Sequence, residues 1–205
     1  LLNAIVSVRL SPEIGLKKVH QAPRSFKDIY QGSSDKFGGR GAVANFSAVR
    51  DTFLEDQIEA VLESQFICEA LECSVARYAA RNRNDELLES LSRKLEDYET
   101  ALNDDEVKLM YEKDEEFHRT LANFCFPTRL WKITNQAKLQ MDRVRHLSLP
   151  IPERQINVLK EHRWIFQNIA NGNETGAEKA MKEHLEYIHH DLKIVQRKYP
   201  EYFKD

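Results

Sequence analysis

The sequence predicts an all-α protein, an antiparallel bundle of six to seven helices that begins near residue 51. Three observations support this prediction. From residue 51 onward, apolar residues recur at the three- and four-residue steps of a helix almost without interruption. Five of the seven glycines lie in the first fifty residues, so the remainder holds few positions that weaken a helix. The breaks between periodic segments are short, which favours antiparallel neighbours.

The first fifty residues have a different character. They carry eight Lys and Arg against three Asp and Glu, whereas the remainder has an excess of eight acidic groups. A glycine-rich turn leads into a short strand expected within 37–46, and no helix-turn-helix is evident. We therefore divide the chain into an N-terminal segment, 1–50, and a helical domain, 51–205. The basic segment is the part that would meet a polyanion, although charge alone fits a solvated tail equally well.

Three helices are expected before Pro127, which ends the third of them. Asn84 is placed to cap the second helix, which begins with an acidic first turn. Residues 103–106 are expected to cap the third helix in the same way. The first helix spans about 52–81, and its expected inward stripe is Ile58, Val61, Leu62, Phe66, Ala70, Cys73, Ala76 and Ala80.

Three further helices are expected after Pro127, spanning about 128–146, 153–170 and 175–197. The segment between the first two of these contains two prolines and predicts a rigid connector. The last helix opens with the capping-box spacing of Thr175 and Glu178.

Polar side chains interrupt the inward stripes of three of these helices. Asp114 and His118 are four residues apart on an otherwise apolar face, so their Cβ atoms lie roughly 5–6 Å apart. His162 and His184 each replace an apolar residue in the stripes of the fifth and sixth helices. Because burying such groups without a partner is costly, each must be hydrogen-bonded or bound to a cation.

These four side chains predict a divalent metal site made by Asp114, His118, His162 and His184. Three imidazoles and one carboxylate suit Zn²⁺, our first choice, and also Ni²⁺, Mn²⁺ and Fe²⁺. A single inward histidine is more often a satisfied core residue, and the prediction depends on the same interruption occurring in three stripes.

The remaining histidines and the cysteines are given no role in the site. His146 is expected at the end of a helix, where a cation is favoured. The other three histidines are His20, His189 and His190. The sparse cysteines, Cys68, Cys73 and Cys125, form no CxxC pair and suit the reduced, buried thiols of a cytoplasmic protein. No apolar run is long enough to span a membrane.

Four motifs occur in a fixed order along the helical domain: Leu71-Glu72 with Ala79-Ala80, Asp114-x-x-Phe117-His118, Glu161-His162-x-x-Ile165, and Ala180-Met181-x-x-His184-Leu185. In these motifs, residues 53–198 resemble the ligand-binding FCD domain of the FadR-like subfamily of GntR transcription regulators. Residues 40–44 also resemble the last strand of that family's DNA-binding wing.

The resemblance implies an FCD-like bundle preceded by a partial or divergent winged-helix segment. In that family, the positions that match Asp114, His118, His162 and His184 bind a divalent metal, and a small carboxylate effector binds on or beside it. The implied partners are a second copy of the chain in a homodimer and operator DNA, which would be contacted through the N-terminal segment.

The chain departs from the family pattern at two places. Cys68 stands where the family usually has an arginine, and arginine is a natural clamp for a carboxylate. Arg143 and Arg145 are our candidate replacements as effector-binding residues, although basic residues near a helix end are often only solvated. The asparagine that commonly follows the Asp-x-x-Phe-His helix is also missing, and residues 126–128 stand there instead.

The leading hypothesis is therefore a cytoplasmic, metabolite-responsive transcriptional regulator and not an enzyme. A small organic acid would coordinate the metal and shift the equilibrium between two arrangements of the dimer. The alternative is a metal-dependent enzyme that acts on a small carboxylate at the same three-His, one-Asp site. A third option, a bundle stabilised by metal but without an effector, predicts that no organic acid adds to the stability that the metal gives.

Overall fold

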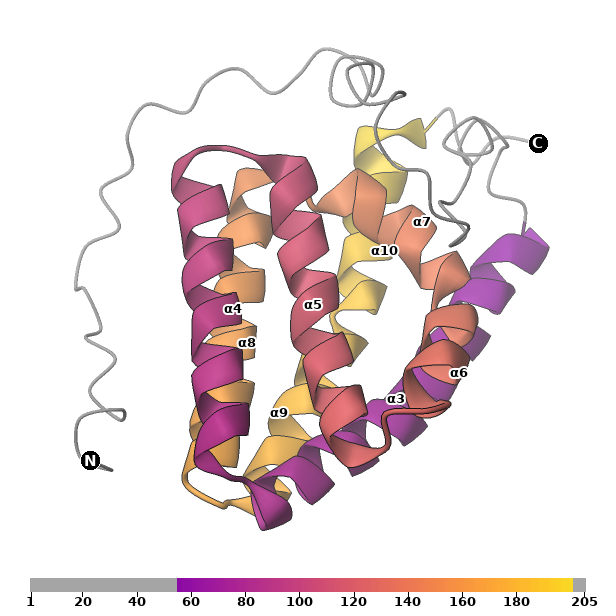
Figure 1. Ribbon diagram of the computed structural model, residues 1–205. Coiled ribbons are helices and arrows are strands. Elements are labelled where there is room, and N and C mark those ends of the chain that lie inside the picture. Colours follow the sequence, from indigo (N-terminus) through magenta and orange to yellow (C-terminus); the bar gives the residue numbers. More distant parts are fainter. Residues whose placement is uncertain (1–54, 201–205) are drawn as a thin grey trace. The chain divides into compact units, whose positions relative to one another are not determined.

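The computed structural model describes residues 55–200 and their side chains from residue 58 onward. Within this range the chain forms eight helices and no strand, which confirms the predicted all-α class (Figure 1). They are α3 (Glu55–Asn82), α4 (Asp85–Asn103), α5 (Val107–Cys125), α6 (Leu130–Ala137), α7 (Leu139–Ser148), α8 (Pro152–Ala170), α9 (Glu174–Glu186) and α10 (Ile188–Lys198). The strand expected within 37–46 and His20 lie outside the described residues. Among the described helices, none is long and apolar enough to cross a bilayer.

The helices pack into a bundle around one apolar core. Helix α4 packs against α5 and against α8, and α9 packs against α3 and against α8 (Figure 1). Helix α7 packs against α10 and against α3. The inward stripes expected around His162 and His184 are confirmed: Val158, Ile165, Ile169, Ala177, Met181, Ile188 and Leu192 are all buried. The bundle therefore brings the predicted metal-ligating faces of α5, α8 and α9 toward a common interior.

Two of the expected helices are each broken into two. The helix predicted over 128–146 is divided at Lys138, which separates α6 from α7. The break places the Lys138 ammonium inside the bundle, where Asp142 and Glu115 bind it at 2.6 and 2.7 Å. The helix predicted over 175–197 is divided at Tyr187, whose ring lies 4.2 Å from the Arg154 guanidinium carbon. In both cases a buried charge is accommodated where the helix changes direction.

The helix caps were predicted correctly at one of three positions. The Asn84 side chain accepts a hydrogen bond from the Leu87 N–H at 2.9 Å and caps α4, as expected. Helix α5 has no side-chain cap, because residues 104–106 instead turn the chain out of α4, with Asp105 at a φ of 57°. Helix α9 is capped by Asn173 and not through the predicted capping box.

The predicted inward stripe of α3 was partly wrong. Leu62 and Ala70 are exposed, and Phe66 retains 73% of its accessible surface. Val61, Cys73, Ala76 and Ala80 are buried as predicted. The buried face also contains residues outside the predicted stripe: Gln65, Cys68, Glu72, Val75 and Ala79. Helix α3 is therefore rotated so that a carboxylate enters the interior and the large apolar side chains of its first half remain outside.

A glycine in the loop between α8 and α9 allows the loop between α3 and α4 to approach closely. Gly172 has a φ of 67°, and a β-carbon there would collide with the Arg83 guanidinium. Arg83 donates hydrogen bonds to the carbonyls of Ala170 and Ala80, each at 3.0 Å. The arginine thus binds the end of α8 to the end of α3.

Candidate metal centre

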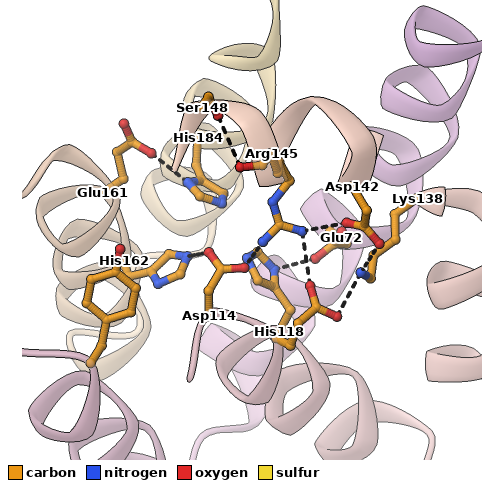
Figure 2. A network of polar contacts seen from close by, with 12 residues as sticks. Glu72, Asp114, His118, Lys138, Asp142, Arg145, Ser148, Glu161, His162 and His184 are labelled. Atoms are coloured by element: carbon orange, nitrogen blue, oxygen red, sulfur yellow. Dashed lines mark hydrogen bonds and ion pairs between the residues drawn. The ribbon is translucent and has the colours of Figure 1, made fainter. Parts of the chain in front are cut away.

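The structure brings the four predicted metal ligands together. Asp114 and His118 come from α5, His162 from α8 and His184 from α9, and all four are buried (Figure 2). One donor atom from each lies within 4.8 Å of the others. Two donors bound to one ion at about 2.1 Å are separated by at most about 4.2 Å. Around a tetrahedral ion the donors are about 3.4 Å apart, so the cluster can close on a single ion after side-chain shifts of about 1 Å or less.

The Nε2 atom of His162 is buried at this cluster without a hydrogen-bond partner among the described residues. It lies 3.5 Å from Oδ1 of Asp114. The ring is fixed by stacking on Phe117, with centroids 4.4 Å apart and planes inclined by 9°. A buried polar atom without a partner is costly, and a cation at this position would remove that cost.

His118 is oriented by a carboxylate from α3. Its Nδ1 lies 2.5 Å from Glu72 Oε2, which leaves Nε2 as the nitrogen available to an ion (Figure 2). Burial opposes the charged form of both groups, but their mutual attraction outweighs it. The pKa of His118 is therefore raised and that of Glu72 lowered. Such carboxylate-histidine pairs fix the ring and raise its basicity in metal sites.

His184 has the same arrangement with a carboxylate from α8. Its Nδ1 lies 2.7 Å from Glu161 Oε2, and Arg154 holds the same carboxylate at 2.9 Å. Burial, followed by the charge of His118, lowers the pKa of His184 well below its usual range. Burial, followed by the charges of His184 and His118, does the same to the pKa of His162. These two rings are therefore neutral, as a metal ligand must be.

Of the two predicted effector-binding arginines, only Arg145 lies at the site. Its guanidinium contacts the Asp114 carboxylate and binds Asp142 at 2.9 Å and Glu115 at 3.0 Å. Arg143 is half-buried, donates to Gln140 at 3.4 Å and does not line the cavity beside the cluster.

Two acidic residues that were given no place in the site belong to it. Glu115, which follows Asp114 in the chain, binds Lys138 and Arg145 inside the bundle. Glu161, which precedes His162, orients His184. Glu116, by contrast, binds Lys94 of α4 at 2.9 Å.

His146 is not the helix-terminal cation that the sequence suggested. It is buried, and burial together with the nearby charges of Arg145 and Lys138 lowers its pKa to about 3. Its imidazole is therefore neutral at physiological pH. His189 and His190 are exposed on α10 and are not part of the cluster.

A small cavity of about 40 Å³ lies beside the cluster, bordered by Asp114, His118 and His184. Since a water needs about 10–15 Å³ by this measure, there is room for roughly three waters. Cys68 lines the cavity, together with three cationic side chains, Lys138, Arg145 and Arg154. Sequence reasoning missed Lys138 and Arg154, because a basic residue in a helix gives no periodic signal that distinguishes a buried ion pair from a solvated charge.

This chain belongs to the FCD domain family, whose model matches residues 63–187, more than half of the chain. The match confirms the resemblance to GntR-family regulators that the four motifs indicated.

Similar proteins carry regulator names. The chain is 26% identical over 145 residues to the HTH-type transcriptional repressor RspR of Escherichia coli (strain K12), which covers 71% of this chain and 64% of RspR. The same values hold for the uncharacterized HTH-type transcriptional regulator YdfH of Shigella flexneri. A regulator of Streptomyces ambofaciens, from an unstable DNA locus, is 30% identical over 90 residues, 44% of this chain and 38% of that protein.

The chain thus spans 64% of the length of the first two relatives. The FCD match places the helical domain in this family, and the relatives that the chain resembles are named as transcription regulators.

Proposed function

We propose that this protein is a transcription regulator whose helical domain binds a divalent metal and a small organic acid. Asp114, His118, His162 and His184 hold the metal, and Zn²⁺ is the first choice for three imidazoles and one carboxylate. The observation that supports this most directly is the convergence of four buried donor atoms within 4.8 Å. The carboxylates behind His118 and His184 add the orienting partners that metal-binding histidines usually have.

The cavity beside the cluster is the proposed effector site. A bound ion would supply a Lewis-acidic position that a carboxylate oxygen can occupy. The chain's own contribution is to hold the ligands and to exclude bulk water. Arg145 lines the cavity and contacts Asp114, so it is the predicted arginine that can also reach an effector.

The regulatory step is proposed to pass through α3. This helix follows the N-terminal segment directly in the chain, and its Glu72 binds His118 in the site. An effector with different affinities for two positions of α3 would therefore shift the segment that precedes it. We assign operator binding to residues 1–50 and the sensing role to 51–205. We further propose that the protein is a cytoplasmic homodimer and that the dimer binds a palindromic operator.

Elemental analysis of the purified protein tests the metal site. We expect about one divalent ion per chain in the wild type and its loss in the double variant His162→Ala, His184→Ala. The matched control is His189→Ala, His190→Ala, which removes two exposed histidines of α10 and should retain the ion. A wild-type protein that neither contains nor takes up Zn²⁺, Ni²⁺ or Mn²⁺ would contradict the metal site.

Thermal unfolding of the metal-loaded protein with small carboxylates tests the effector site. A ligand that binds the native state raises the midpoint with concentration. Stabilisation by metal without any further effect of an organic acid would favour a metal-stabilised bundle that has no effector.

A further inference from the structure

The cationic side chains around the cavity are already neutralised by buried carboxylates. The Lys138 ammonium is bound by Asp142 at 2.6 Å and by Glu115 at 2.7 Å. Arg145 contacts these same two residues and Asp114. Arg154, on the other side of the cavity, binds Glu161 at 2.9 Å and Asp191 at 3.0 Å. Each lining cation therefore has at least two carboxylate partners.

The site as a whole has an excess of negative charge. Six carboxyl groups line the cavity or bind its cations: Glu72, Asp114, Glu115, Asp142, Glu161 and Asp191. Three lining cations face them. With neutral histidines, a divalent ion would still leave one excess negative charge. If one of the six carboxyls carries a proton, the ion-loaded site is neutral, and each lining cation still has a carboxylate partner.

This balance limits the charge of any effector. A first carboxylate can bind the ion directly, because the ion's charge is close and unscreened. A second carboxylate would find every lining cation already paired, and it would add repulsion in a buried site of low dielectric. Releasing a cation for it would leave a protein carboxylate buried without its partner, which is also costly.

Apart from Ser148, whose hydroxyl donates to the Arg145 carbonyl, the remaining wall of the cavity is apolar. It is formed by Met141, Leu149, Val158, Leu185 and Ile188. Such a wall accommodates hydrocarbon and offers no partner to a charged group. A volume of about 40 Å³ further restricts the ligand to a few carbon atoms.

We propose that the effector is a short monocarboxylic acid with an uncharged, largely apolar remainder, and that di- and tricarboxylates are rejected. This inference rests on the proposed metal and effector site and specifies its ligand class. Cys68 is the position that sets this preference. The Cys68 side chain lines the cavity, is fully buried and is uncharged. An arginine at the same position would add a fourth lining cation.

Calorimetric titration of the Zn²⁺-loaded protein tests the inference with an isosteric pair. Malonate and 3-methylbutyrate have the same number and branching of non-hydrogen atoms and differ by one carboxylate. We expect 3-methylbutyrate to bind at least about tenfold more tightly. Malonate binding as tightly or more tightly would overturn the inference while leaving the proposed function intact. Elemental analysis after each titration separates binding from removal of zinc.

If neither acid binds although zinc is retained, the effector site of the proposed function fails, and this inference fails with it. If zinc itself does not bind, the metal site fails first. The three failures are therefore distinguishable in one series of measurements.

Variants that change the charge balance provide the second test. Cys68→Arg should raise the affinity for malonate relative to 3-methylbutyrate, but a buried arginine can prevent folding. Glu115→Gln removes one negative charge with little change of shape and should shift the ratio in the same direction by about tenfold. Glu112→Gln, an exposed position on the same helix, is the matched control and should leave the ratio unchanged. An unaltered ratio in Glu115→Gln would contradict charge as the basis of selection.

Discussion

Glu161 holds His184 from behind: its carboxylate lies 2.7 Å from the His184 Nδ1, and Arg154 fixes the same carboxylate at 2.9 Å. The chain Arg154–Glu161–His184 thus orients one proposed ligand through two charged contacts. Because Glu161 contacts Nδ1 of His184, the other ring nitrogen, Nε2, is the one available to an ion in the cluster.

Glu161→Gln should weaken zinc binding by about 10- to 100-fold, because the ring loses a charged orienting partner while the ligand itself remains. Competition with a chromophoric chelator measures the affinity. Glu178→Gln is the control, because the ion pair of Glu178 with Arg77 at 3.4 Å is exposed. Equal zinc affinities in wild type and Glu161→Gln would show that this contact serves packing alone.

Zinc binding should be lost as the pH falls, with a midpoint that depends on Glu72. The attraction of Glu72 outweighs burial and raises the pKa of His118, so His118 retains its proton to a higher pH than a free imidazole. A proton on His118 excludes the metal, and zinc affinity therefore decreases as the pH falls through that raised pKa. In Glu72→Gln the midpoint should move to lower pH. A midpoint unchanged by the substitution would mean that another group controls the loss.

The three cysteines should react slowly in the native protein. Burial raises the pKa of Cys68 and Cys73 to about 12 and that of Cys125 to about 11. Since the thiolate is the reactive species, labelling with a disulfide reagent at pH 8 should be slow. In denaturant, all three thiols should react at the rate of a free cysteine. Rapid native labelling of even one thiol would contradict the packing of α3 or α5.

Gly172→Ala should lower the free energy of unfolding by about 1 kcal/mol or more, because an alanine at a φ of 67° is strained. The new methyl group would also displace the Arg83 guanidinium. Urea unfolding of Gly172→Ala, Arg83→Ala and the double variant separates the two effects. If the collision contributes, Gly172→Ala should cost less in the Arg83→Ala background than in the wild type.

The sequence was sufficient to locate the cluster because its four residues lie in stripes that are otherwise apolar. In α8 and α9 the residues three and four positions from His162 and His184 are hydrophobic, so the buried face was unambiguous. The same rule failed in α3. There, hydrophobicity favoured Leu62 and Phe66, whereas the buried face contains Cys68 and Glu72.

The contacts behind the ligands could not be predicted for a different reason. Glu72 and His118 are 46 residues apart, and Glu161 and His184 are 23 apart. Their pairing depends on how the helices cross, and no local pattern encodes that. The helix breaks at Lys138 and Tyr187 could not be predicted either, because neither break contains a glycine or a proline. They are stabilised instead by the buried ion pair of Lys138 and by the stacking of Tyr187 on Arg154.

The four proposed ligands come from three helices, and the last of them, His184, lies 70 residues after Asp114 in the chain. During synthesis on the ribosome, a nascent chain that has emerged only through α8 carries Asp114, His118 and His162 without their fourth partner. The site can close only when α9 has emerged and docked against α3 and α8. Capture of the ion would therefore come late in biogenesis, as the event that marks a finished domain.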